Sequence, residues 1–232
     1  MKLSTTLLPL ALIACNGEPP INIDTGPEDG GVLPATVDFD SGKVASMVVE
    51  TVNGSIDLQP GGEAGGVRVD VVRQDQAESW DYFLQDQVLQ MWPLCENGVL
   101  GCSSGFAIGA PATMEAYLST VSGETKISDY NGNVTIENTQ GLVTGLRLKG
   151  GNLVATGNSA TMNIEFLNEP ESVELTTIDG TINLEIPRGT YNLDVTTNGV
   201  RSLIDPTTLI QGDGPTILIK STSGDVTVTG VE

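Results

Sequence analysis

Short runs of strictly alternating apolar and polar residues are the dominant pattern along this chain. The alternation is clearest in Val67–Val71 and Ile182–Ile186, and it recurs in residues 134–136, 217–219 and 226–228. A period of two residues is that of a half-buried β-strand, and the Gly, Asn and Asp residues between the runs are typical of turns. Helical periodicity is nearly absent, so the pattern predicts an all-β protein.

A unit of the form Gly-x-apolar-x-apolar, preceded by a polar residue, recurs along the chain. Its copies are Val52–Leu58, Val121–Ile127, Tyr130–Ile136, Ile178–Leu184 and Thr222–Val228. Gly123, Gly132, Gly141 and Gly150 are nine residues apart, which suits one strand and one tight turn. We expect Gly123, Gly132, Gly180 and Gly224 to lie at corners between strands, several of them with positive φ, because Gly adopts that conformation without steric cost.

Repeated strand–turn units of this length predict a single-stranded β-helix, or β-solenoid, whose layers bury one continuous core. The pattern leaves open whether each layer has two faces or three. The apolar positions of the unit should face that core, namely Ile127, Val134, Ile136, Ile182, Leu184, Val226 and Val228. Thr135, Asn183 and Thr227 should then face outwards, since neighbouring side chains of a strand point to opposite sides.

A longer repeat accompanies the short one. Pro111 is followed after twelve residues by Gly123, and Pro187 is followed after twelve by Gly199. Each pair encloses an alternating strand and the sequence Thr-x-x-Gly. The last copy of the short unit lies in Thr222–Gly230, near the end of the sequence.

This combination resembles the DUF4097 family of adhesin-like domains and the related head-GIN adhesin-like domains. The resemblance covers most of residues 110–232 and, more loosely, residues 36–72. It implies a single-stranded β-helix-like fold in the cell envelope and an adhesive role, and it supplies no catalytic residues.

Residues 73–109 depart from the repeat and contain both Trp residues. Trp80, Leu84 and Val88 would share one face of a helix, but the alternation favours a strand over residues 87–92. Two interpretations fit the aromatic side chains of this segment. They form either a cap that shields one end of the solenoid or an exposed binding surface. These side chains are Trp80, Tyr82, Phe83, Trp92 and Phe106.

The N-terminus has the features of an export signal. Lys2 precedes a short apolar run, and Leu12-Ile13-Ala14-Cys15 resembles the bacterial lipobox, in which the Cys carries lipid and becomes the first mature residue. The apolar run is shorter than the ~20 residues that span a bilayer. We therefore expect a signal peptide at 1–14, lipidation of Cys15, an acidic flexible tether over 15–35, and a β-solenoid domain over 36–232. Asn16 after the Cys favours the outer membrane of a bacterium.

Composition narrows the functional classes. The chain has 30 acidic and 10 basic residues, for a net charge of −20, which argues against nucleic acid as a partner because phosphate binding needs clustered Lys and Arg. Cys95 and Cys102 remain once Cys15 carries lipid, and in an exported chain they are expected to form one disulfide. The chain contains no His, so a Cys/His metal site is not expected.

The absence of His also removes the common nucleophilic triads and most zinc hydrolase sites. The acidic pairs Asp38/Asp40 and Glu169/Glu171 are the candidates for a glycosidase. Arg147 and Lys149 would share one strand face, where a polysaccharide lyase needs positive charge to neutralise a uronate.

Acidic residues in the tether and at turns are candidate calcium ligands, but none matches a calcium-loop motif. These residues are Asp24, Glu28, Asp29, Asp205, Asp213 and Asp225. We therefore expect no cofactor and no catalytic residue. The sequence predicts a non-enzymatic envelope lipoprotein, structural or adhesive, that is bound to the membrane through Cys15 and has an unknown carbohydrate or protein ligand. The alternative is an extracytoplasmic carbohydrate-active enzyme on a β-helix.

Overall fold

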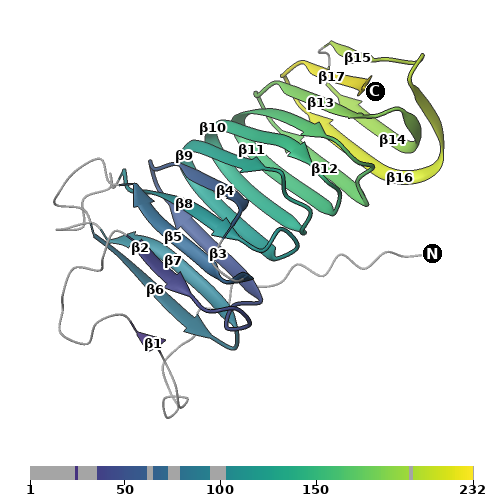
Figure 1. Cartoon of the computed structure of the whole chain (residues 1–232). Helices are drawn as coiled ribbons and strands as arrows, with labels where there is room; N and C mark the ends of the chain where they lie inside the picture. The colour runs from purple at the N-terminus through teal and green to yellow at the C-terminus, as the bar shows by residue number, and fades with distance from the viewer. Residues whose placement is uncertain are drawn as a thin grey trace, which may run out of the picture.

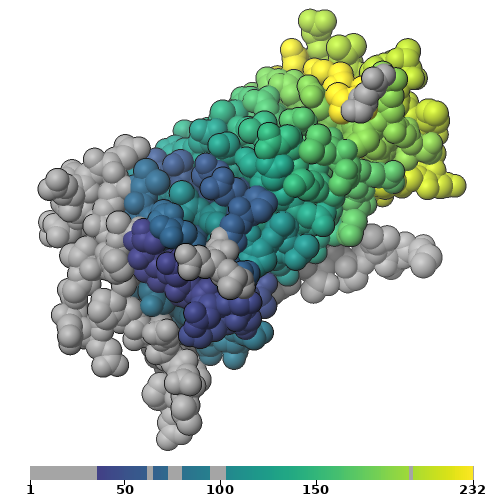
Figure 2. Space-filling view, in the orientation of Figure 1, coloured from purple at the N-terminus to yellow at the C-terminus, as the bar shows by residue number. Residues whose placement is uncertain are grey.

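The structure, a computed structural model, describes residues 24–25, 36–61, 65–72, 79–94, 103–198 and 201–231. The strands β1 to β17 of these residues belong to one large hydrogen-bonded sheet. The all-β prediction is therefore confirmed. Figure 1 shows the strands stacked along one long axis, and Figure 2 shows the same order as bands of colour on the surface. Among the described residues, no helix is long and apolar enough to cross a membrane.

The strands differ in length along the chain. The first eight are β1 (Asp24–Thr25), β2 (Thr36–Phe39), β3 (Ser46–Thr51), β4 (Ile56–Pro60), β5 (Val67–Val72), β6 (Ser79–Gln85), β7 (Val88–Leu94) and β8 (Gly105–Ala110). Three long strands follow, β9 (Glu115–Ser128), β10 (Val134–Leu148) and β11 (Asn152–Phe166). The last six are β12 (Ser172–Thr177), β13 (Ile182–Pro187), β14 (Gly189–Thr197), β15 (Ser202–Ile204), β16 (Leu209–Ser221) and β17 (Val226–Val231).

Parallel, in-register pairing joins the central strands. Val134 of β10 pairs with Ala116 of β9 on one side and with Leu153 of β11 on the other. β11 then pairs with both β12 and β13, because Asn152 lies beside Ser172 and Met162 lies beside Ile182. The chain thus returns beside itself after each short circuit, and we call each such circuit a layer.

The spatial order of the layers departs from the sequence order at both ends (Figure 1). The layer of β3 and β4 lies between β9 and the later layer of β7 and β8. At the other end, the layer of β16 and β17 lies between the layer of β12 and β13 and the layer of β14 and β15. The sequence repeat did not predict either inversion.

Antiparallel strands cover the N-terminal end of the stack. β6 pairs with β7, β5 pairs with β8, and β2 pairs with β5. Asp24 and Thr25, within the predicted tether, pair with Leu84 and Phe83 of β6. The strand predicted over residues 87–92 is confirmed as part of β7.

Aromatic side chains close the core at this end. Trp80 and Phe106 are buried, with ring centroids 5.9 Å apart, and Phe39 packs edge-on against Tyr82 at 5.1 Å. Trp80 and Phe106 thus lie in the core at this end, as the interpretation as a cap expects. Phe83 and Trp92 are only partly buried, since alternation turns them to the other face of the β6–β7 hairpin.

One hydrophobic cluster runs through all the layers. The seven apolar residues that the repeat unit assigned to the core are all at most 5% exposed. Thr135, Asn183 and Thr227 are partly exposed on the outer face. The predicted register is therefore confirmed, and it follows from the period of two together with the parallel stacking of equivalent positions.

The expected positive φ angles are found at other glycines than predicted. Gly141 and Gly150 have φ of 145° and 132°, whereas Gly123, Gly132, Gly180 and Gly224 are absent from the positive-φ residues. The reason for Gly at these four positions is close contact between layers. A Cβ on Gly180 would lie 1.7 Å from the carbonyl oxygen of Ala160, and one on Gly224 would lie 1.7 Å from that of Gly180.

The Thr-x-x-Gly sequence forms a hydrogen-bonded corner. In β12, Thr177 Oγ1 accepts a hydrogen bond from the backbone N–H of Gly180 at 3.1 Å and lies 3.4 Å from the carbonyl oxygens of Asn158 and Ala160 in the preceding layer. Equivalent corner positions are in register with one another along the stack. They are Thr51, Thr120, Asn138, Thr177 and Ser221, all at most 5% exposed.

We expect Thr177→Val to lower the free energy of unfolding by about 1–3 kcal/mol, because it leaves the buried N–H of Gly180 without its acceptor. Thr177→Ser keeps the hydroxyl and should cost less. Thr176→Val, one residue away on the outer face, should stay within about 0.5 kcal/mol. Urea unfolding of the three variants measures the difference. Equal loss in Thr176→Val and Thr177→Val would show that the corner hydrogen bond is unimportant.

Candidate functional site

A shallow groove of about 320 Å³ lies on the outer face across β10, β11 and β13. Its polar side chains come from equivalent positions of two layers. Asn163 pairs in register with Asn183 and accepts a hydrogen bond from its Nδ2 at 2.8 Å, and Glu165 pairs in register with Glu185. Because parallel neighbours in register lie side by side, the groove presents two amides next to two carboxylates.

An irregularity in β10 shapes one side of the groove. The register of β10 against β11 shifts between Gly145 and Leu148, and Arg147 has a φ of 51°. Leu146 is 37% exposed and lines the groove beside Ile164 and Glu165. The bulge re-aims side chains next to it, as bulges commonly do. The groove therefore combines polar oxygen and nitrogen atoms with an exposed apolar side chain.

Arg147 and Lys149 lie beside one shared carboxylate, that of Asp129, and the charge of Glu165 in the groove also acts on Arg147. Both basic groups contact Asp129, through an Arg147 guanidinium hydrogen bond and a Lys149 ammonium 3.6 Å from the carboxylate. The hydrogen bond from Arg147, followed by the charges of Arg147 and Lys149, holds the pKa of Asp129 below its ordinary value. The positive charges of Arg147 and Lys149 thus lie beside the negative carboxylate of Asp129.

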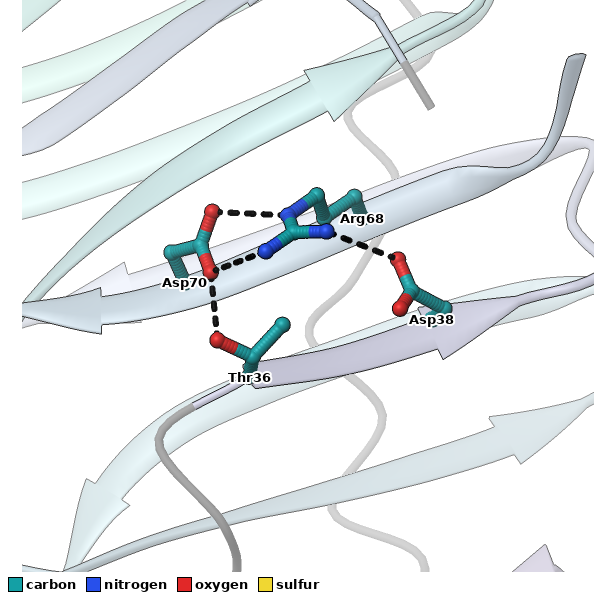
Figure 3. Close-up of polar contacts among 4 residues, drawn as sticks. All are labelled: Thr36, Asp38, Arg68 and Asp70. Carbon is teal, nitrogen blue, oxygen red and sulfur yellow. Dashed lines mark hydrogen bonds and ion pairs between the residues drawn. The ribbon is translucent and has the colours of Figure 1, made fainter. Parts of the chain in front are cut away.

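The two members of the acidic pair Asp38/Asp40 have different basic partners. Asp38 of β2 lies 3.9 Å from a guanidinium nitrogen of Arg68 on β5, whereas Asp40 pairs with Lys43 at 3.0 Å. Figure 3 shows Arg68 between Asp38 and Asp70, with Thr36 donating its hydroxyl to Asp70 at 2.6 Å. The hydrogen bonds from Arg68 and Thr36 lower the pKa of Asp70. This network joins two antiparallel strands near the end of the stack.

Several of the other acidic candidates accept hydrogen bonds from neighbouring residues. Glu171 accepts a hydrogen bond from Asn152, and Asp225 accepts one from the backbone of Arg201. Asp205 accepts hydrogen bonds from Thr207 and Thr208, which lower its pKa. In the part of the chain that the structure describes, no group of three or more acidic, Cys or His side chains could hold a metal ion.

The three Cys residues lie outside the described residues. The lipidation of Cys15 and the disulfide between Cys95 and Cys102 therefore stay predictions, as do the roles of Glu28 and Asp29.

The groove residues were not singled out from the sequence, although a signal was present. Asn163-Ile164-Glu165 and Asn183-Leu184-Glu185 repeat the form Asn-apolar-Glu twenty residues apart. That spacing is the pairing offset between β11 and β13. Searching for polar identities at the layer spacing would have found all four side chains.

Comparison with known proteins leaves the family open. No family model matches the chain, and no curated protein matches it. The predicted resemblance to DUF4097 domains therefore stays a prediction. Among solved structures, the chain is similar to a "putative cell adhesion protein" from Clostridium sporogenes, at 11% identity and a TM-score of 0.47. The similarity covers 84% of this chain and 98% of the other. A likeness of this size supports no inference about function.

Proposed function

We propose that this chain is a non-enzymatic lipoprotein of the bacterial cell envelope, a β-solenoid held on a lipid tether at Cys15 and used for structure or adhesion. The observation that carries the proposal is the repetition of outward side chains from layer to layer. Asn163 and Asn183 continue one row, and Glu165 and Glu185 continue the next. Repeat proteins use such extended, periodic surfaces for binding.

Three further features support this assignment. The lipobox-like Leu12–Cys15 and the acidic stretch after it are typical of a lipid anchor and spacer. The strongly negative charge suits a protein that stays dispersed at a cell surface. The ion pairs of Arg147 and Arg68 with their neighbouring carboxylates suit a structural surface better than a catalytic one.

The groove also suggests a second candidate function. Glu165 and Glu185 lie side by side next to exposed Leu146, an arrangement that could contact a polysaccharide. A lyase or glycosidase would need one of these carboxylates as a base or acid, with a cation to balance developing charge.

Incubation of the purified chain with polygalacturonate and alginate separates the two functions. We expect neither unsaturated uronate products, measured by ultraviolet absorbance, nor new reducing ends. If products form, and if Glu165→Gln abolishes them while Glu124→Gln does not, the chain is a carbohydrate-active enzyme and the proposal is wrong. Glu124 is an exposed carboxylate of β9 outside the groove, so it is a matched control.

A further inference from the structure

The C-terminal end of the stack contains a layer that is inserted out of sequence order. Thr216 of β16 pairs with Ser172 of β12 on one side and with Asn192 of β14 on the other. Val226 of β17 likewise lies between Ile182 of β13 and Ser202 of β15. We call β16 and β17 with their connection, residues 209–231, the inserted layer, and we call the strands β14 and β15 the outer layer. The described strands of the outer layer pair with the inserted layer, which in turn pairs with the layer of β12 and β13.

The repeat spacing shows that the outer layer has two compatible neighbours. Asn152 of β11 pairs with Ser172, a spacing of twenty residues, and Ser172 and Asn192 have the same spacing. Ile182 and Ser202 are also twenty apart. By its own repeat, the outer layer would therefore stack directly on the layer of β12 and β13. The inserted layer occupies a slot between two layers that match each other.

The inward side chains on both sides of the slot are apolar and in register. Ile217 of the inserted layer lies between Val173 and Leu193, and Ile219 lies between Leu175 and Val195. Ile217 and Ile219 are fully buried, whereas Leu193 and Val195 are partly buried at the end of the core. If the inserted layer leaves, the outer layer can close onto Val173 and Leu175 and keep those residues from water. Opening the slot therefore exposes less apolar surface than the loss of an ordinary layer would.

The connection between the two layers is short and held by local hydrogen bonds. Asp205 to Thr208 join β15 to β16, and the Asp205 carboxylate accepts hydrogen bonds from the hydroxyls of Thr207 and Thr208 at 2.6 and 2.8 Å. Short connections of this kind act as hinges when an element is exchanged between copies of a chain.

We propose that the slot between the layer of β12 and β13 and the outer layer is a binding site for the inserted layer of a second copy of this chain. Two copies then associate end to end by exchanging residues 209–231. The exchanged layer makes the same hydrogen bonds and core contacts in the partner as in its own chain, so the exchange costs little beyond association and hinge opening. Within one chain, the layer is held close to its own slot at a high effective concentration. A second copy competes with this insertion only when the protein concentration is high, so high concentration favours the exchange. Added salt also favours it, since each copy carries a net charge of −20.

Disulfide trapping between two single-cysteine variants tests the exchange. Full-length chains in which Cys15, Cys95 and Cys102 are all replaced by Ala, and which carry either Ser172→Cys or Thr216→Cys, are mixed, partly unfolded, refolded at high concentration and salt, and oxidised. The locked chain described next has the same background. Ser172 and Thr216 are register partners on neighbouring strands, a separation that a disulfide can bridge. The control mixture combines Ser172→Cys with Glu124→Cys, which is exposed on a distant layer. We expect about tenfold more cross-linked heterodimer than in the control, because exchange raises the local thiol concentration. Equal yields would overturn the proposal.

A locked chain provides the second measurement. The variant with both Ser172→Cys and Thr216→Cys in one chain should oxidise within the monomer and hold its inserted layer in place. We expect the dimer formed by the parent chain after the same refolding, measured by size-exclusion chromatography, to be lost on oxidation and restored on reduction. A dimer that persists in the locked chain would show that copies associate through another surface. Failure of the double variant to oxidise as a monomer would show that the inserted order is wrong. Either result overturns the proposal.

Discussion

Gly180→Ala is expected to lower the free energy of unfolding by about 3 kcal/mol or more, since overpacking a rigid core has costs of this order and the contact here is with backbone. The added Cβ would lie 1.7 Å from the carbonyl oxygen of Ala160 and 2.4 Å from its carbonyl carbon. Relief requires the layers to separate, which would also weaken the hydrogen bond from Gly180 N–H to Thr177. Urea or thermal unfolding of the purified variant measures the loss.

Gly42→Ala is the matched control, because it separates crowding from backbone conformation. Gly42 has a φ of 80° and nothing within 4 Å of an added Cβ, so its substitution should cost only about 1–2 kcal/mol of left-handed strain. A Gly180→Ala variant no less stable than Gly42→Ala would contradict the close approach of the layers. Gly224→Ala should behave like Gly180→Ala, since its Cβ would meet the carbonyl oxygen of Gly180 at the same distance.

Cys15→Ala is expected to move the protein from the membrane fraction to the soluble fraction. The lipobox-like Leu12–Cys15 makes this thiol the predicted attachment point, and acyl chains contribute about 0.8 kcal/mol of membrane affinity per buried CH₂. The net charge of −20 offers no electrostatic attraction to anionic lipid that could replace the chains. Fractionation in high salt and the mass of the N-terminal peptide measure the change.

Cys95→Ala is the control for this experiment, because it removes a Cys outside the signal and should leave the protein on the membrane. A Cys15→Ala variant that still fractionates wholly with membranes in high salt would show that a lipid on this residue is not the anchor. It would also remove the tether from the proposed function, while leaving the exchange of residues 209–231 untouched.

Local periodicity was enough to predict which residues lie in strands and which way they face. Alternation placed Val134, Ile136 and Leu184 in the core and Thr135 outside, because side-chain direction in a strand depends only on neighbouring positions. The same local logic failed for the repeated glycines. It expected positive φ at several of Gly123, Gly132, Gly180 and Gly224, and none of them has it. At Gly180 and Gly224 the reason for Gly is a carbonyl oxygen from another layer, which no local pattern contains.

The candidate groove likewise depends partly on local pattern and partly on contacts between layers. The Asn-apolar-Glu pattern at 163–165 and 183–185 could be read from the sequence, but its meaning depends on knowing that residues twenty apart pair. The sequence by itself determined the strands, their inward faces, the acidic charge and the lipobox-like start, since these depend on residue type and short-range spacing. Only the tertiary structure decided that β16 and β17 enter between two layers that the repeat would stack directly. Equivalent apolar positions in every layer make several stacking orders compatible with the pattern, and the order is selected by packing of the whole stack.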